Sequence, residues 1–205
     1  MSPTTRSNTS QSQQSQQSQS QSEHKSSKFK FKNDDNILRR ILTESKNIAL
    51  IGASDKPHRD SYEIMGLLLE YGYNVYPVNP TLAAKKDNNG SNIKLYNRTV
   101  YSSMKDIASK AGIKIDLVDI FRKSDQVENI VNEIIDIGDA KCVWFQIGVN
   151  NDIATKKAIN AGLLVARNVC PYHELPRLGI TGPNGPNPTN SNNSNSSSNH
   201  NNNHM

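Results

Sequence analysis

The sequence predicts a doubly wound, Rossmann-like α/β domain with a mainly parallel five-stranded sheet and helices on both faces. Two observations predict this fold class. Segments typical of strands alternate with segments typical of helices along residues 34–180. The strand segments are continuous apolar runs, which indicates strands that are buried on both faces. With right-handed crossovers, five such strands form one parallel sheet.

The helices follow from apolar periodicity and from residues that can cap a helix. Asp34 or Asp35 can cap a first helix, and Ile37, Leu38, Ile41 and Leu42 fall on one face of it. Further helices are expected at residues 62–71 with Gly72 as the stop, at 104–110, between a Ser124 cap and Gly138, and at 153–161. Strands are expected at residues 47–53, 74–78, 115–121, 142–147 and 163–169. Residues 83–99 are expected to be a surface excursion, and residues 170–174 a closing turn.

Three regions are expected along the chain: a tail at residues 1–33, the domain at 34–180 and a tail at 181–205. Residues 1–27 are rich in Ser and Gln, and residues 183–205 are rich in Asn and Ser. Such segments bury too little apolar surface to offset the entropy of ordering, so both are predicted to be disordered. Their Gln and Asn content could also mediate weak self-association.

Charge and composition disfavour several classes of partner and location. The net charge is +5, but residues 1–33 carry five basic residues and one acidic residue, which leaves the domain near neutral. A near-neutral domain disfavours a nucleic-acid partner. The chain has no run of 18 apolar residues and no hydrophobic N-terminal stretch, so neither a membrane span nor a signal peptide is expected. Two cysteines are too few for a disulfide framework, and a cytoplasmic location is expected.

The loop after the first strand, residues 52–62, has the chemistry of a phosphate site. Gly52 allows a tight turn, Ser54 and Ser61 supply hydroxyls, and Arg59 supplies a cation. Together with the free amides of the next helix, they predict binding of a phosphate or pyrophosphate. Each residue alone is better explained as a tight turn or a solvated charge than as part of a binding site. Their order at one strand end favours the site.

The same loop disfavours NAD as the ligand. It lacks the second and third glycines of the G-x-G-x-x-G fingerprint. The second strand ends in Pro77-Val78-Asn79-Pro80, without the acid that would bind the ribose hydroxyls of NAD. A phosphorylated adenosine is permitted there, because it would meet no carboxylate.

Five segments in order carry a resemblance to a known family: GASDKPHRDSY, GYNVYPVNP, DLVDIFRKSDQV, VWFQIGV and CPYHELPRLG. Over roughly residues 35–179 the chain resembles the stand-alone CoA-binding proteins of the bacterial YccU type. These are similar to the CoA-binding domain of the succinyl-CoA synthetase alpha subunit. The resemblance implies a Rossmann-like domain that binds coenzyme A or an acyl-CoA.

The resemblance also implies which residues bind the ligand. The first loop would contact the phosphates through Gly52, Ala53, Ser54, Lys56, Arg59 and Ser61. The adenosine would be bound by Val78, Asn79 and Pro80, together with Phe121 and Arg122. Gln146 and Gly148 would lie near the pantetheine arm. Two departures from the family are Asp60, where a proline is expected, and a longer excursion at residues 85–92.

Binding without catalysis is expected. The related synthetases transfer a phosphoryl group through a histidine on a second domain, and only the Asn/Ser tail follows Gly179. Cys170, His173 and Glu174 could form a nucleophile set or half of a metal site, but zinc needs three or four ligands. No catalytic residue and no metal ligand is therefore assigned. Cys170 could form a mixed disulfide with bound CoA if its pKa were lowered.

Two other functions stay open at this point. One is an NAD(P)- or nucleotide-dependent enzyme built on this fold. The other is a regulatory subunit that docks on a separate catalytic chain through Phe121, Tyr172 or the tails. The expected partner is the small molecule CoA, with no nucleic acid and no membrane, and a homodimer or a docking partner also fits the sequence.

Overall fold

The computed structural model describes residues 29–183. The tails predicted to be disordered, residues 1–33 and 181–205, lie outside the described residues except for residues 29–33 and 181–183. The chain divides into two units after Lys30, and the architecture below is that of the second unit, from Phe31.

A five-stranded parallel sheet forms the centre of this unit and confirms the predicted fold class. Its strands, in chain order, are β1 (Asn47–Ile51), β2 (Asn74–Val78), β5 (Leu117–Ile120), β6 (Cys142–Phe145) and β7 (Leu164–Arg167). The spatial order is β2-β1-β5-β6-β7, with every neighbouring pair parallel. The order reverses between β1 and β5, so this pair is the switch point of the sheet. Pro77 lies in β2, at the edge of the sheet, where a proline is tolerated.

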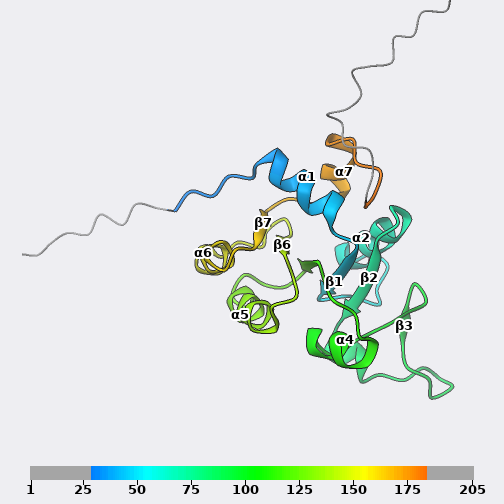
Figure 1. Ribbon diagram of the computed structural model, residues 1–205. Helices are drawn as coiled ribbons and strands as arrows, with labels where there is room; N and C mark the ends of the chain where they lie inside the picture. Colours follow the sequence, from blue (N-terminus) through cyan, green and yellow to red (C-terminus); the bar gives the residue numbers. More distant parts are fainter. Residues whose placement is uncertain (1–28, 184–205) are drawn as a thin grey trace, which may run out of the picture. The chain divides into compact units, whose positions relative to one another are not determined.

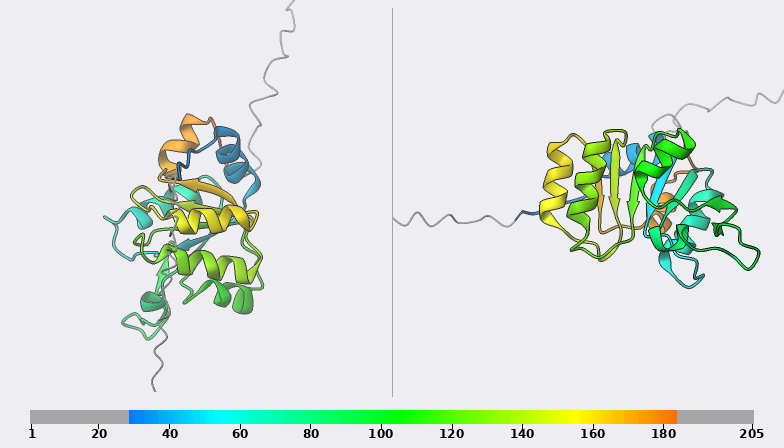
Figure 2. Two further views of the ribbon diagram at one scale, coloured as in Figure 1. Left: turned by 90° about the vertical axis from the view of Figure 1, so that its left-hand side faces the viewer. Right: turned by 90° about the horizontal axis from the view of Figure 1, so that it is seen from below.

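Helices cover both faces of the sheet (Figure 1). They are α1 (Asp35–Glu44), α2 (Asp60–Glu70), α3 (Pro80–Ala83), α4 (Met104–Ala111), α5 (Val127–Ile137), α6 (Asp152–Asn160) and α7 (Pro171–Arg177). Apolar residues of α1, α2 and α7 pack in one core cluster, and those of α4, α5 and α6 pack in a second cluster on the other face. Figure 2 (right) shows α5 and α6 side by side in front of the sheet.

Local sequence explains most helix boundaries. The Asp34 carboxylate accepts hydrogen bonds from the backbone amides of Asn36 and Ile37, which begins α1 as predicted. Leu38, Ile41 and Leu42 are buried on its inner face. Gly138 ends α5 in the left-handed conformation, also as predicted.

Two local predictions are wrong. Ser124 does not cap α5: its hydroxyl donates to the carbonyl of Gly148 and accepts from the amide of Asn150, so it joins two loops instead. The segment after β7 is the helix α7 rather than a turn, because Pro171 is suited to a first helical position and Leu175 is buried.

The excursion between β2 and α4 is mostly exposed, as expected, but it contains two short strands. β3 (Lys94–Leu95) and β4 (Arg98–Thr99) pair in antiparallel fashion around a two-residue turn. Tyr96 and Asn97 in this turn have φ values of 46° and 61°. A turn with two positive φ values is favoured between antiparallel strands because its twist matches theirs.

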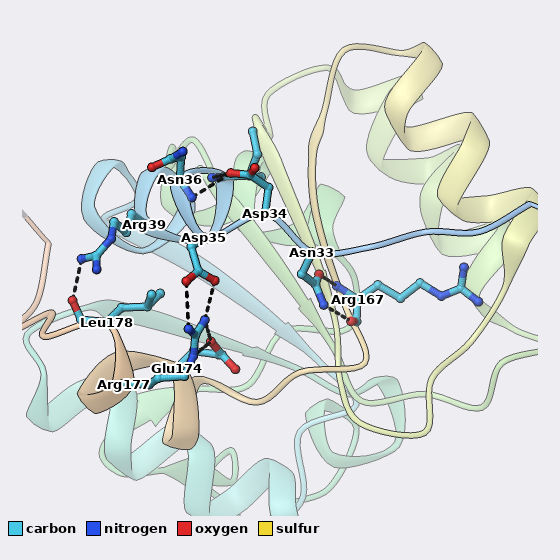
Figure 3. A network of polar contacts seen from close by, with 10 residues as sticks. Asn33, Asp34, Asp35, Asn36, Arg39, Arg167, Glu174, Arg177 and Leu178 are labelled. Atoms are coloured by element: carbon cyan, nitrogen blue, oxygen red, sulfur yellow. Dashed lines mark hydrogen bonds and ion pairs between the residues drawn. The ribbon is translucent and has the colours of Figure 1, made fainter.

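A polar clasp, formed by Asn33, Asp35, Arg167, Glu174 and Arg177, joins the ends of the described domain (Figure 3). The Asn33 side chain donates to the carbonyl of Arg167 at 2.8 Å and accepts from its amide at 2.9 Å. The Arg177 guanidinium binds both carboxylate oxygens of Asp35, at 2.8 and 2.9 Å, and also binds Glu174. The clasp therefore ties the chain before α1 to the edge strand β7 and ties α1 to α7.

None of the helices within residues 29–183 has the length and apolar character needed to cross a membrane.

Candidate functional site

A cleft of about 1430 Å³ lies at the carboxyl ends of the strands, where the order of the sheet reverses. Its walls come from the segments after β1, β2, β5, β6 and β7, from one side of α2 and from Tyr96. This is larger than the roughly 300–1,000 Å³ of sites for drug-sized ligands. Both its place and its size suit an extended ligand bound across the switch point.

The loop after β1 reaches the loop after β5 because residue 52 is a glycine. Gly52 has a φ of 91°, and a Cβ added to it would come within 2.3 Å of the carbonyl oxygen of Phe121. Its amide donates to the carbonyl of Val78 at 2.9 Å. Gly52 thus brings the ends of β1, β2 and β5 together at the base of the cleft.

Hydrogen bonds hold the rest of this loop in place. The Asn79 amide group donates to the carbonyl of Ala53 at 2.8 Å, while its side-chain oxygen caps α3 by accepting from the amide of Leu82. The Ser54 hydroxyl accepts from the amide of Lys56 at 3.2 Å. The amide of Arg59 donates to the carbonyl of Lys56 at 3.0 Å. These bonds within the chain give the loop a defined shape.

The two helices that follow the strands of the switch point lack side-chain caps. Neither Arg59, the N-cap of α2, nor Gln126, the N-cap of α5, makes a side-chain hydrogen bond to the first turn. In contrast, α3 and α6, which follow β2 and β6, are capped by Asn79 and Asn151. The first amides of an uncapped helix, together with its dipole, favour an anion.

Cations gather at the same place. Lys56 and Arg59 from the loop after β1, with Arg122 and Lys123 from the loop after β5, line the cleft. Across residues 29–183 none of these four side chains forms an ion pair, whereas Asp55 of the same loop lies 3.9 Å from the ammonium of Lys85. This half of the cleft can bind a polyanion such as a pyrophosphate.

The other half of the cleft is less charged. Gln146, Ile147 and Gly148 follow β6, and Cys170 and Tyr172 come from the start of α7. The amide of Gly148 donates to the side chain of Asn168 at 2.9 Å, which fixes this loop against the one after β7. Ile147 and Tyr172 are each 60% exposed, so they offer apolar surface to a ligand.

Two ionisable groups in this half have raised pKa values. Asp119 is buried in β5, and desolvation raises the pKa of its carboxyl to about 7 although Gln146 donates to it at 2.8 Å. Burial likewise raises the pKa of the Cys170 thiol. The condition for a reactive Cys170, a lowered pKa, is therefore not met.

Most of the predicted ligand-binding residues lie along this one cleft: Gly52, Ala53, Ser54, Lys56, Arg59, Ser61, Asn79, Phe121, Arg122, Gln146 and Gly148. Val78 and Pro80 do not line it. Val78 is buried in the core and contributes its backbone carbonyl, and Pro80 is the first residue of α3. Asp60, the departure from the family pattern, also lines the cleft at the start of α2.

Sequence reasoning missed several residues of the cleft. Lys123 follows Arg122 directly, and this adjacency was the available signal. Tyr96 comes from the excursion: its ring lies 4.6 Å from that of Tyr62. A Cβ on Gly66 would come within 2.7 Å of the Tyr96 hydroxyl, so the tyrosine needs this glycine. No short motif marks such an approach between distant segments.

Within residues 29–183, no group of three or more His, Cys, Asp and Glu side chains is arranged as metal ligands. His173 instead packs edge-on against the ring of Tyr172, at 5.2 Å between ring centroids.

Comparison with known proteins gives consistent relatives. YneT of Bacillus subtilis (strain 168) is 32% identical over 133 residues, which are 65% of this chain and 87% of YneT. The structure of a hypothetical protein from Pyrococcus horikoshii OT3 is similar, with a TM-score of 0.61 and 42% identity over 71% of this chain and 92% of that one.

A larger enzyme contains a similar domain. The dinucleotide-forming acetyl-coenzyme A synthetase 1 of Ca. Korarchaeum cryptofilum, solved with phosphate and ADP, matches with a TM-score of 0.50 and 26% identity. The match covers 64% of this chain but 27% of the synthetase, so the similarity is to one part of that enzyme.

A family model described as the CoA binding domain matches residues 46–176. The matched range runs from just before β1 into α7 and includes every loop that lines the cleft. The chain therefore belongs to the CoA-binding domain family.

Proposed function

We propose that the protein binds coenzyme A or an acyl-CoA in the cleft at the switch point, and that binding rather than catalysis is the activity of this domain. One observation carries the proposal. Four cations that form no ion pair within residues 29–183 lie where two helices lack side-chain caps: Lys56, Arg59, Arg122 and Lys123. CoA carries a pyrophosphate and a ribose phosphate, which need such a site.

The phosphates would be bound by the loop after β1. Arg59 would pair with a phosphate through its guanidinium, and the Ser54 and Ser61 hydroxyls are placed along the same wall. The ribose phosphate would meet no carboxylate at the end of β2, because Asn79 stands there and its side chain is already bonded to Ala53 and Leu82. This arrangement favours CoA over NAD.

The pantetheine arm would lie against the loops after β6 and β7. Gln146 and Gly148 offer polar groups to its amides, and Ile147 and Tyr172 offer apolar surface to its methylene groups or to an acyl chain. The raised pKa of the Cys170 thiol disfavours a nucleophilic role for the cysteine that lines this half. These features support a binding role.

Calorimetric titration of the full chain with CoA, acetyl-CoA, dephospho-CoA, NAD and NADP tests the proposal. We expect saturable binding of CoA and acetyl-CoA, weaker binding of dephospho-CoA and none of NAD. Binding of NAD or NADP in place of CoA would overturn the proposal in favour of an enzyme that uses those cofactors. Absence of all binding would also overturn it and would favour a role in docking on another chain.

Substitution Arg59→Ala tests the phosphate half. A charge-assisted hydrogen bond to a phosphate contributes roughly 1.5–3 kcal/mol, so CoA affinity should fall by that amount. Arg40→Ala is the matched control, because Arg40 is exposed on α1 and pairs with Glu44 outside the cleft. Equal affinities of the two variants would remove Arg59 from the site.

A further inference from the structure

Asp119 is an exceptional residue in the core. It lies in the central strand β5 between Leu50 and Trp144 of the neighbouring strands, and it is 1% exposed. Its Oδ2 atom is buried and has no hydrogen-bond partner among the described residues. A buried polar atom without a partner costs free energy, so such an atom calls for a reason other than stability.

Asp116, which directly precedes the same strand, is an aspartate with a structural role. Its Oδ2 accepts hydrogen bonds from the backbone amides of Lys46 and Asn47, each at 3.0 Å. Those bonds tie β1 to the start of β5. Asp119 ties no backbone segment to another through its side chain. Its one side-chain partner is Gln146, and that residue lines the cleft.

The chemistry of this pair fixes the orientation of the glutamine. At a pH above its pKa of about 7, the Asp119 carboxylate is ionised and can only accept hydrogen bonds. The Gln146 nitrogen is then the atom that faces Asp119, with Nε2 at 2.8 Å from Oδ1. Gln146 is 5% exposed, and its remaining polar atom, the carbonyl oxygen Oε1, is left for the cleft. An unrestrained glutamine could present either end of its amide.

We propose that Asp119 is a positioning residue that holds Gln146 with its carbonyl oxygen ready to accept a hydrogen bond from an N–H donor of the bound ligand. The inference rests on the proposed function and extends it. In CoA, the donors of that chemistry are the two amide groups of the pantetheine arm, so the pair would select for an amide-bearing arm rather than a bare nucleotide.

The neighbours of Asp119 do not offer it another role. Cys170, the N-cap of α7, is an ionisable group close enough for Asp119 to raise the pKa of its thiol. Among the described residues, this thiol donates no hydrogen bond to the carboxylate of Asp119. Asp119 can therefore affect a ligand through its hydrogen bond with Gln146.

A double-mutant cycle tests this inference, with CoA titrated calorimetrically into the full chain at a pH well above 7. The variants are Asp119→Asn, Gln146→Leu and the double variant. Asn can both donate and accept, so it no longer selects one orientation of Gln146. We expect each single variant to bind CoA roughly 3- to 10-fold more weakly, which is the loss of about one hydrogen bond.

The double variant gives the decisive comparison. If Asp119 acts through Gln146, the double variant binds CoA no more weakly than Gln146→Leu alone, because the group being positioned is gone. If the fold-loss in CoA affinity of the double variant equals the product of the two single losses, Asp119 acts independently of Gln146, and the inference is overturned. Asp116→Asn is the matched control, with the same change at the residue directly before the same strand, and it should leave CoA affinity unchanged.

Side-chain resonances provide a second measurement. In isotopically labelled protein, CoA should shift the side-chain carbonyl ¹³C signal of Gln146, which the Gln146→Leu variant identifies by its absence. This measurement needs only the wild-type chain if Asp119→Asn does not fold, and a signal that CoA leaves unchanged overturns the inference. If the wild-type chain binds no CoA at all, the proposed function fails as well. If the wild-type chain binds CoA but the cycle shows no coupling between Asp119 and Gln146, the inference fails and the proposed function stands.

Discussion

The polar clasp and the cleft use charged side chains in opposite ways. In the clasp, Arg177 binds Asp35 and Glu174, and Asn33 satisfies both backbone groups of Arg167 (Figure 3). In the cleft, the four cations of the loops after β1 and β5 form no ion pair with any residue between 29 and 183, and one oxygen of Asp119 has no partner.

This difference separates groups that hold the fold from groups that are free to bind a ligand. Paired groups in the clasp fix α1 and α7 against each other and cover the edge of β7. Unpaired groups in the cleft add little to the stability of the protein without ligand, and a buried unpaired oxygen lowers it. Functional sites commonly carry such a cost. Removing a paired group of the clasp should therefore lower stability, whereas removing an unpaired group of the cleft should leave stability unchanged or raise it.

The largest effect should come from Asp119, through the dependence of stability on pH. Its pKa is about 7 in the folded chain, against an ordinary value of 3.8. Between these values the folded state holds a proton that the unfolded state has lost, so stability falls as pH rises through this window. A difference of about three pKa units corresponds to roughly 4 kcal/mol.

Urea unfolding of the wild-type chain and of Asp119→Asn, measured from about pH 4 to pH 8, checks this expectation. The stability of Asp119→Asn should not decline as the pH rises through this window. The stability of the variant minus that of the wild-type chain should therefore be larger above pH 7 than at pH 4. Other carboxyls, such as Asp35 with its pKa lowered by the bond to Arg177, titrate in both proteins and cancel. Parallel pH profiles for the two proteins would contradict a buried, titrating Asp119.

A pair of glycines should give the next largest effect. Gly52 and Gly72 have φ values of 91° and 87°, so alanine is strained to a similar extent at both. An added Cβ meets the Phe121 carbonyl at position 52 and meets nothing within 4 Å at position 72. We expect Gly72→Ala to cost about 1 kcal/mol of unfolding free energy and Gly52→Ala about 3 kcal/mol.

Chemical denaturation measures both costs, and CoA titration separates the two sites further. Gly52→Ala should also weaken CoA binding, since the loops after β1 and β5 must move apart at the base of the cleft. Gly72→Ala should bind CoA as the wild-type chain does. Equal stabilities for the two variants would show that the close approach at Gly52 is not a constraint.

Much of the fold could be predicted because its signals are local. Each buried parallel strand is a continuous apolar run, and the predicted bounds of β2 match the observed ones. Periodicity gave α1 and α5, with Leu38 and Val131 on their buried sides. The helix α7 escaped prediction because it has seven residues, two of them prolines, and too few apolar positions to show a period.

The candidate site was predictable where one loop supplies several groups, and not where distant segments meet. The loop after β1 carries its glycine, hydroxyls and cations within ten residues, and they all lie along the cleft. Asp119 could have been noticed as an acid in the middle of an apolar strand, but its partner Gln146 is 27 residues away. Tyr96 reaches the cleft through a left-handed turn that no sequence pattern in the excursion indicated.

The smallest of these effects should be found in the clasp, at Asn33. Its side chain satisfies both the amide and the carbonyl of Arg167, so Asn33→Ala leaves two backbone groups of the edge strand without these partners. Net contributions of about 0.5–1.5 kcal/mol for each bond, partly recovered by water at this exposed edge, predict a loss of about 1–2 kcal/mol. CoA affinity should not change, because Asn33 lies outside the cleft.

Asn36→Ala is the matched control, since the Asn36 side chain is exposed on α1 and its backbone amide keeps its bond to Asp34. Its stability should stay within about 0.5 kcal/mol of the wild-type value. Asn33→Ala should lower the free energy of unfolding and leave CoA affinity unchanged. Arg59→Ala should have the opposite pattern, with weaker CoA binding and unchanged stability. If Asn33→Ala weakened CoA binding as well, the clasp and the cleft would be coupled through β7, and the division between holding groups and binding groups would fail.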